Sequence, residues 1–194
     1  MLNDLQLKKI KDFGIDLDWN GAFDGKSKGN RHLFRIVNKS KEIAKNFDVD
    51  LTIIEAAAWL HDTNLEKTVT GDTLANLDKI LKLFNDLDIE KNVQEKIIHC
   101  IEAHDGRIPA KTIEAKIIHD ADTLEKTGPL GIIRETWKRS QIGWNSEQII
   151  EHLKIHIKKR SDRLYTDIAR SIADKNNKML DDFFLIIDEQ ISEN

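Results

Sequence analysis

The sequence predicts an all-α protein. Apolar residues recur at separations of three and four residues along most of the chain, which is the spacing of one face of a helix. No segment alternates apolar and polar residues between turn signals, as a half-buried strand would. Only two prolines and nine glycines occur in 194 residues, so few positions interrupt a helix. A bundle of amphipathic helices around a hydrophobic core is therefore expected.

The composition narrows the class of protein. Charged residues make up 33% of the chain and hydrophobic residues 40%, which is the balance of a folded globular protein. A chain of 194 residues can fill one hydrophobic core, so we expect a single domain over residues 1–194. The formal net charge of -4 gives no overall positive field, which argues against a nucleic-acid partner.

Cysteine content and hydropathy favour a cytoplasmic protein. The single cysteine, Cys100, cannot form an intrachain disulfide, and the N-terminus has no signal-peptide pattern. No apolar run approaches the roughly 18 residues that cross a bilayer, so no membrane partner is expected. The sequence leaves the oligomeric state open.

The first helices can be placed from their apolar stripes. A short N-terminal helix carries Leu5 and Ile10, and the glycine-bearing stretch 14–30 is expected to form a loop. The next helix begins at His32. Its apolar stripe consists of Leu33, Ile36, Val37, Ser40, Ala44 and Phe47.

A third helix is apolar on nearly every side and is therefore expected to be buried. Asp50 can cap its N-terminus. Its apolar residues are Ile53, Ile54, Ala56, Ala57, Ala58, Trp59 and Leu60. This helix runs directly into the pair His61-Asp62.

Further helices follow to the end of the chain. One has an apolar face made of Leu74, Leu77, Leu81 and Phe84. The next has a face made of Val93, Ile97, Ile101 and His104. Thr112 can cap a helix that stops at Gly128-Pro129, and three or four more amphipathic helices are expected over residues 132–191.

Three His-Asp pairs occur where the composition predicts roughly one by chance. They are His61-Asp62, His104-Asp105 and His119-Asp120. The apolar helix before His61 would carry that pair into the interior, where an unpaired carboxylate is costly unless a cation or a donor meets it. A bound metal ion would remove the free-energy cost of burying this carboxylate. The alternative is that the pair forms only a helix end and an exposed turn, which is the more common role of an isolated His-Asp pair.

Two aspartates near residue 120 have different expected roles. Asp120 lies on the apolar stripe that also carries Ile113, Ile117 and Leu124, which places a carboxylate on a core-facing surface. Asp122 lies about 200° further round the helix. We therefore expect Asp120 to bind the metal and Asp122 to support it through a hydrogen bond to a neighbouring helix.

These residues resemble the HD superfamily of metal-dependent phosphohydrolases, whose pattern is a His, a His-Asp pair after an apolar helix, and a distant Asp. Residues 32–37, HLFRIV, look like the opening helix of that family, and residues 56–62, AAAWLHD, look like its second motif. Residues 120–124, DADTL, with the glycines and arginine that follow, are similar to the closing motif of a small uncharacterised bacterial and archaeal subgroup. The resemblance covers about residues 32–134 and leaves 135–194 as helices packed on that core.

The resemblance implies a metal-dependent hydrolase of a phosphate ester, such as a nucleotide, with a small phosphorylated substrate as its partner. By this resemblance His32, His61, Asp62 and Asp120 are the metal ligands. Two imidazoles and two carboxylates without a thiolate suit Mn²⁺, Fe²⁺, Ni²⁺ or Mg²⁺ better than a closed structural zinc site. Such an ion lowers the pKa of a water and polarises a phosphoryl oxygen.

The expected catalytic residues are Asp62, His104 and Arg35. Arg35 lies about one turn after His32 on the same side of its helix, which makes it the first choice for the substrate phosphate. His104 could contact phosphate, transfer a proton or bind a second ion, and it could equally be a core histidine. The weaker phosphate-binding candidates are Lys67, Arg107 and Arg134.

Other histidines and two alternative functions stay open at this stage. His152 and His156 stand four residues apart, a spacing that can hold zinc, but without nearby acidic ligands in a known order we expect a solvated surface. One alternative function is a nucleotide-sensing HD module without catalysis. The other is a two-metal HD oxygenase, which would need His104 and a further histidine as second-site ligands.

Overall fold

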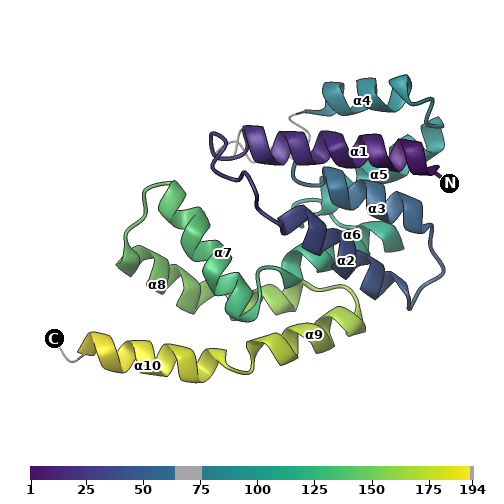
Figure 1. Cartoon of the computed structure of the whole chain (residues 1–194). Helices are drawn as coiled ribbons and strands as arrows, with labels where there is room; N and C mark the ends of the chain where they lie inside the picture. Colours follow the sequence, from purple (N-terminus) through teal and green to yellow (C-terminus); the bar gives the residue numbers. More distant parts are fainter. Residues whose placement is uncertain (64–75, 193–194) are drawn as a thin grey trace. The chain divides into compact units, whose positions relative to one another are not determined.

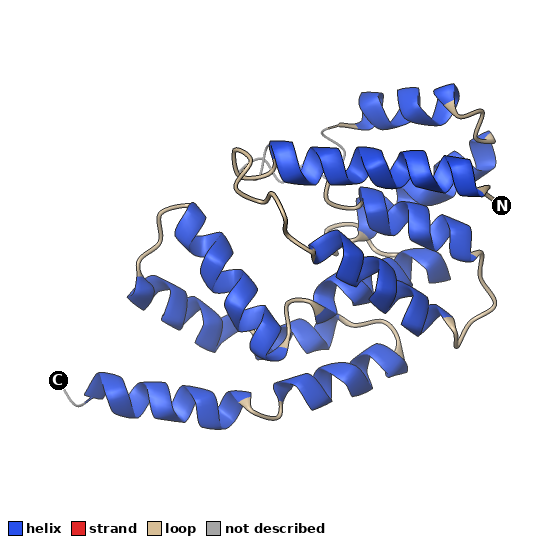
Figure 2. Cartoon of the chain, in the orientation of Figure 1, coloured by secondary structure: helices blue, strands red, loops and turns tan. Residues whose placement is uncertain are grey.

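A computed structural model describes residues 1–63 and 76–192 of the chain (Figure 1). Over these residues every regular element is a helix and no strand occurs (Figure 2), which confirms the predicted all-α fold. The chain forms two units, Met1–Asp122 and Thr123–Asn194. The single domain over residues 1–194 stays a prediction.

Helix α3 is the centre of the first unit. The helices of this unit are α1 (Asp4–Asp16), η1 (Leu17–Gly21), α2 (His32–Ala44), α3 (Leu51–Leu60), α4 (Leu77–Asp86), α5 (Lys91–Ala103) and most of α6 (Ile113–Leu124). Seven of the ten residues of α3 are buried, and α3 packs against α1, α2 and α5. Burial on several sides explains why α3 has almost no polar face. As predicted, Asp50 caps α3, because its side chain accepts a hydrogen bond from the Thr52 N–H at 2.8 Å.

The stretch predicted as a loop over residues 14–30 is helical over residues 14–21 and forms turns over residues 22–29. Helix α1 continues through Gly14 to Asp16, and the π-helical turn η1 follows it. The loop prediction is wrong over residues 14–21, because Gly14 serves close packing rather than a turn: a Cβ there would overlap the carbonyl oxygen of Trp59. The true turn lies later, where Gly25 and Gly29 have φ of 78° and 85°.

Two hydrogen bonds through Asn30 link η1 to the first residue of α2. The indole Nε1 of Trp19 donates to the carbonyl oxygen of Asn30 at 3.0 Å. The side-chain oxygen of Asn30 accepts from the backbone N–H of His32 at 3.1 Å. The first residue of α2 is therefore held from the preceding segment.

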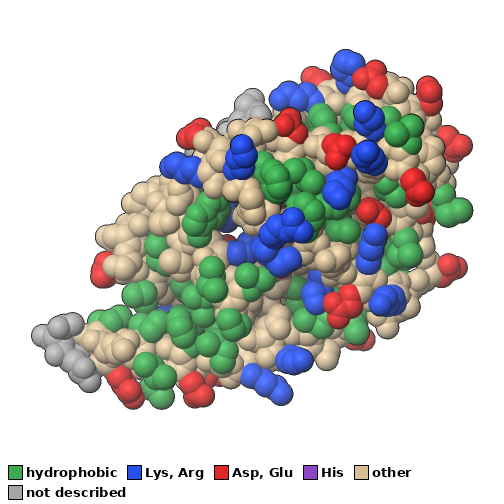
Figure 3. Space-filling model, viewed as in Figure 1, with side chains coloured by type: hydrophobic (Ala, Val, Ile, Leu, Met, Phe, Trp, Pro, Cys, Tyr) green, Lys and Arg blue, Asp and Glu red, His purple; other side chains and the backbone are tan. Residues whose placement is uncertain are grey.

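The second unit consists of four α-helices and one short 3-10 helix. They are α7 (Gly128–Gln141), α8 (Ser146–His156), η3 (Lys158–Arg163), α9 (Asp167–Asn177) and α10 (Leu180–Ser192). Ile149, Leu153, Ile157 and Leu180 form a buried cluster in this unit. Apolar side chains also remain on the surface of α10, among them Leu185, Ile186 and Ile191 (Figure 3). Among the described helices, none has the length and apolar character of a membrane span.

Candidate metal centre

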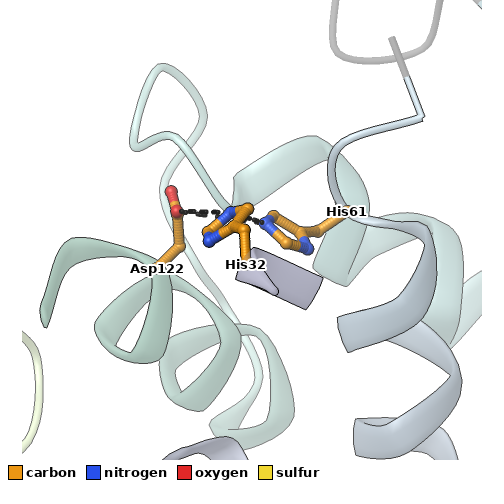
Figure 4. A group of neighbouring side chains, drawn as sticks. All are labelled: His32, His61 and Asp122. Carbon is orange, nitrogen blue, oxygen red and sulfur yellow. Dashed lines mark hydrogen bonds and ion pairs between the residues drawn. The ribbon is translucent and has the colours of Figure 1, made fainter. Parts of the chain in front are cut away.

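Three side chains from three different helices converge in the first unit. His32 begins α2, His61 follows the last residue of α3, and Asp122 lies near the end of α6 (Figure 4). The Nε2 atom of His32 lies 3.1 Å from Nε2 of His61 and 3.6 Å from Oδ1 of Asp122. All three residues are buried, and one ligand atom from each lies within 4.8 Å of the others.

Asp62 joins this group from the next position after His61. Its Oδ2 atom lies 3.0 Å from Nε2 of His32 and 3.5 Å from Nε2 of His61. Its Oδ1 atom lies 3.6 Å from Nε2 of His104, which ends α5. The Asp62 carboxylate therefore faces two imidazoles with one oxygen and a third imidazole with the other.

The backbone fixes the orientation of two of these imidazoles. Nδ1 of His61 lies 2.8 Å from the carbonyl oxygen of Ala58, and Nδ1 of His104 lies 2.7 Å from that of Ile101. In each case Nδ1–H donates to a carbonyl three residues earlier in the same helix. The lone pair of each neutral ring is then on Nε2, which points toward Asp62 and is the usual arrangement of a metal-ligating histidine.

Local hydrogen bonds fix the helix ends that carry these histidines. The Thr63 hydroxyl donates to the carbonyl oxygen of Leu60 at 2.9 Å, which closes the last turn of α3 around the His-Asp pair. The Asn76 amide in turn donates to the carbonyl oxygen of Thr63. At the end of α5, Nδ1 of the buried His119 lies 2.9 Å from the carbonyl oxygen of His104. The third His-Asp pair thus contributes a histidine that holds the backbone of the second.

The electrostatics of the group favour a bound cation. Burial lowers the pKa of His61 to about 4, because the charged imidazolium loses its hydration. Burial works against the charge of Asp62, but the neighbouring imidazoles of His61, His104 and His32 outweigh it and hold the pKa of Asp62 well below its usual value. At neutral pH the group therefore combines a neutral His61 with an ionised Asp62.

The distances between the ligand atoms suit a divalent ion. Ligands about 2.1 Å from an octahedral ion lie about 3.0 Å apart when adjacent and about 4.2 Å apart when opposite. The Nε2 atoms of His32 and His61 lie 3.0 to 3.9 Å from each other and from the nearest carboxylate oxygens of Asp62 and Asp122. Unprotonated nitrogens and carboxylates this close repel one another, and a cation between them removes the repulsion. The donor set therefore fits the metal that the sequence predicted.

Asp122, rather than the predicted Asp120, belongs to the cluster with His32 and His61. Asp120 is fully buried in the same helix, but it is not a member of the cluster that His32, His61 and Asp122 form. The sequence argument assumed that α6 has one core-facing stripe, whereas every residue from Ile117 to Glu125 is buried. Burial alone could not separate the two aspartates, because the rotation of α6 decides which carboxylate faces the imidazoles. Ligation by Asp120 stays a prediction.

The predicted phosphate-binding residues lie in different environments. Arg35 is half-buried on α2, one turn after His32. Arg107 is exposed and its guanidinium is paired with the carboxylate of Asp105. Lys67 lies outside the described residues.

Arg134 belongs to the second unit, where its Nη1 atom lies 3.2 Å from Oε2 of Glu125. Arg107 and Arg134 thus each pair with a carboxylate. Of the predicted cations that the structure describes, Arg35 keeps the best position along the chain, since it shares α2 with His32.

The family follows from a comparison with known proteins. The family model of the HD domain matches residues 30–127, a span that contains His32, the His61-Asp62 pair, His104 and Asp122. The chain belongs to the HD domain family. This confirms the resemblance on which the sequence-based interpretation depended.

Three relatives place this HD domain protein among similar bacterial proteins. The uncharacterised protein YpgQ of Bacillus subtilis is 22% identical over 170 residues, covering 82% of each chain. A solved structure from Lactobacillus plantarum matches with a TM-score of 0.79 and 22% identity, over the whole of both chains. An HD-superfamily hydrolase from Bacillus thuringiensis matches with a TM-score of 0.72 and 19% identity, over 98% of each chain. The structural likenesses establish a shared fold.

YpgQ has also been solved in complex with ADP. That structure matches with a TM-score of 0.71 and 21% identity, over 95% of this chain and 97% of YpgQ. The chain thus has the fold of HD-superfamily hydrolases and a His/Asp cluster suited to a metal ion.

Proposed function

We propose that this HD domain protein is a metal-dependent phosphohydrolase in which His32, His61, Asp62 and Asp122 hold one divalent ion. The observation that carries the proposal is the convergence of two imidazoles and two carboxylates. The two Nε2 atoms lie 3.0 to 3.9 Å from each other and from the nearest oxygen of each carboxylate. Mn²⁺, Fe²⁺, Ni²⁺ and Mg²⁺ all suit these ligands.

The side chains around this centre have separate roles in the proposed reaction. A bound divalent ion supplies a more acidic water and polarises a phosphoryl oxygen. His104 exchanges a proton with the reacting groups through Nε2, because its Nδ1 is occupied by the carbonyl of Ile101. Asp62 holds the His104 ring in place, since its Oδ1 lies 3.6 Å from that Nε2 atom. Arg35 binds the substrate phosphate from the same helix as His32.

The proposed substrate is a small phosphorylated compound of the nucleotide class. The complex of YpgQ with ADP supports this choice, because the two chains share their fold over nearly their whole length. Conversion of such a substrate would release inorganic phosphate or pyrophosphate. A buried centre with ionised carboxylates needs the metal and a cation such as Arg35 to accept an anionic substrate.

The test is a substrate screen on metal-reconstituted protein. Mononucleotides, dinucleotides and sugar phosphates are incubated with Mn²⁺, Ni²⁺ or Mg²⁺. Released phosphate, released pyrophosphate and nucleotide products are measured for the parent protein and Asp62→Asn. We expect metal-dependent release by the parent protein and a loss of about a hundredfold or more in Asp62→Asn. Tight nucleotide binding without release would instead favour the sensing module. Two metal ions per chain with redox activity would favour the oxygenase.

A further inference from the structure

A second cluster of charged side chains lies in the unit Thr123–Asn194, and the proposed hydrolase does not use it. Its centre is Glu135 on α7, whose side chain is 5% exposed. Nη2 of Arg160 lies 3.1 Å from Oε1 of Glu135, and Nε of Arg139 lies 3.4 Å from Oε2. Nε2 of His152 also lies 3.5 Å from Oε2. Three elements, α7, α8 and η3, thus meet at one buried carboxylate.

The charges of this cluster do not balance. Glu135 contributes one negative charge, whereas Arg139 and Arg160 contribute two positive charges. His152 is neutral, because burial and the neighbouring Arg139 lower its pKa and because its Nε2 lies 3.2 Å from a guanidinium nitrogen of Arg139. Lys138 adds further positive potential at Glu135. One guanidinium would be enough to neutralise a structural Glu, so the cluster has an excess of positive charge.

Hydrogen-bond donors of both arginines are also unsatisfied. The Nε atoms of Arg139 and Arg160 are buried and make no hydrogen bond with the residues that the structure describes. The same holds for the Oε2 atom of Glu135, which lies 3.4 Å from Nε of Arg139. Buried N–H groups nearly always donate a hydrogen bond, so these unsatisfied donors are unusual for a purely structural cluster. The side chains of Arg139 and Arg160 remain 29% and 18% exposed, so part of each is open to solvent.

The donor set selects the chemical class of the ligand. His152 and His156 have the spacing that can hold zinc, but the two guanidinium groups beside His152 would repel a cation. The same positive charges attract an oxyanion, and guanidinium groups bind phosphate through paired N–H donors. Arg139 is already oriented, because its guanidinium lies 4.7 Å from the ring centre of Trp144.

We propose that Arg139 and Arg160 bind the phosphate group of a small phosphorylated molecule, at a second site made of residues outside the metal centre. Glu135 holds the two guanidinium groups at this site and leaves their remaining donors to the ligand. A bound phosphate supplies the missing negative charge and accepts hydrogen bonds from the exposed parts of the two guanidinium groups.

The experiment uses the full-length protein after its metal has been removed with a chelator. Its unfolding temperature is measured at pH 7.5 in inorganic phosphate and in sodium chloride of equal ionic strength, and the phosphate Kd follows from the concentration dependence. Arg160→Gln removes a proposed ligand. Lys159→Gln is the matched control, because it removes the same charge from an exposed neighbouring position on η3.

We expect phosphate to stabilise the parent protein and Lys159→Gln, with Kd values that agree within about twofold. In Arg160→Gln the Kd should rise by about tenfold or more, because a charged donor pair is lost. If Arg160→Gln does not fold, Arg139→Lys, which keeps the charge and loses the planar fork, should weaken binding by about threefold or more.

Equal phosphate stabilisation of the parent protein and Arg160→Gln, or no phosphate-specific stabilisation of the parent, would overturn the proposal. The cluster would then be only a hub of ion pairs that joins α7, α8 and η3. Neither readout depends on hydrolysis or on bound metal, so the result is independent of the proposed phosphohydrolase activity. Phosphate held at the metal centre would be retained in Arg160→Gln and is thereby distinguished.

Discussion

The Nε2 atoms of His32 and His61 lie 3.1 Å apart, although 29 residues separate them in the chain. Nδ1 of His61 donates to the Ala58 carbonyl, so its lone pair faces His32. Two such nitrogens are stable at this distance when a proton or a metal ion lies between them. A neutral His32 can donate that proton from Nε2, and a divalent ion can take its place. The pair therefore makes metal binding the first property to test.

Replacing Asp62 with Ala should abolish stoichiometric metal binding. The carboxylate lies 3.0 Å from His32 and 3.5 Å from His61, and it supplies negative charge that offsets the ion. Elemental analysis after reconstitution measures the effect, with about one divalent ion per chain expected for the parent protein. Full metal content in Asp62→Ala would exclude the proposed ligand set.

Asp122→Asn and Asp120→Asn give a direct comparison between neighbouring positions of α6. Asp122 lies 3.6 Å from His32 and 3.9 Å from His61, so its loss should weaken metal affinity by about 10- to 100-fold. Asp120→Asn should weaken it less. Competition with a fluorescent chelator reports both values. A larger loss in Asp120→Asn would restore the assignment made from the sequence.

Arg35→Ala should lower kcat/KM by about ten- to a thousandfold and leave the metal content unchanged. A guanidinium contact to phosphate strengthens as charge develops in the transition state. Arg35→Lys should recover part of the loss, because a point charge cannot reproduce the planar fork. Kinetics are measured on the phosphate ester identified by the screen.

Arg107→Ala is the control for Arg35, since the Arg107 guanidinium is exposed and paired with Asp105. Its kinetics should stay within about twofold of the parent protein. Parental kinetics in Arg35→Ala, with full metal occupancy in the same sample, would remove Arg35 from the site.

Glu135→Gln should destabilise the protein most at neutral pH. Burial works against the charge of Glu135, but Arg160, Lys138 and Arg139 outweigh it and hold its pKa below the usual 4.5. A lowered folded pKa contributes stability that is present above pH 4.5 and is lost as the pH falls through the folded value.

Denaturant unfolding at several pH values measures this contribution. The difference between the parent protein and Glu135→Gln should be about 1–3 kcal/mol at pH 7 and should shrink below pH 4.5. Glu151→Gln, at an exposed position of α8, is the control and should show no comparable difference. A difference that is constant with pH would mean that Glu135 is not ionised in its ion pairs.

The sequence by itself determined the helices and the family. Local spacing gave the all-α fold, the Asp50 cap and the buried α3 that ends at His61-Asp62, because helix periodicity and capping depend on residues within a few positions of one another. The same local signals failed at Gly14, whose role depends on the carbonyl of Trp59, 45 positions away in the chain.

Tertiary structure decided which side chains meet. The choice of Asp122 beside His32 and His61 depends on the rotation of α6, and no stripe could reveal it in a segment that is buried on every side. The meeting of Glu135 with Arg139, His152 and Arg160 depends in the same way on how three elements of the second unit pack. Periodicity in the sequence specifies the face of one helix, whereas a site requires the relative rotation of several helices, which is set by the packing of their cores.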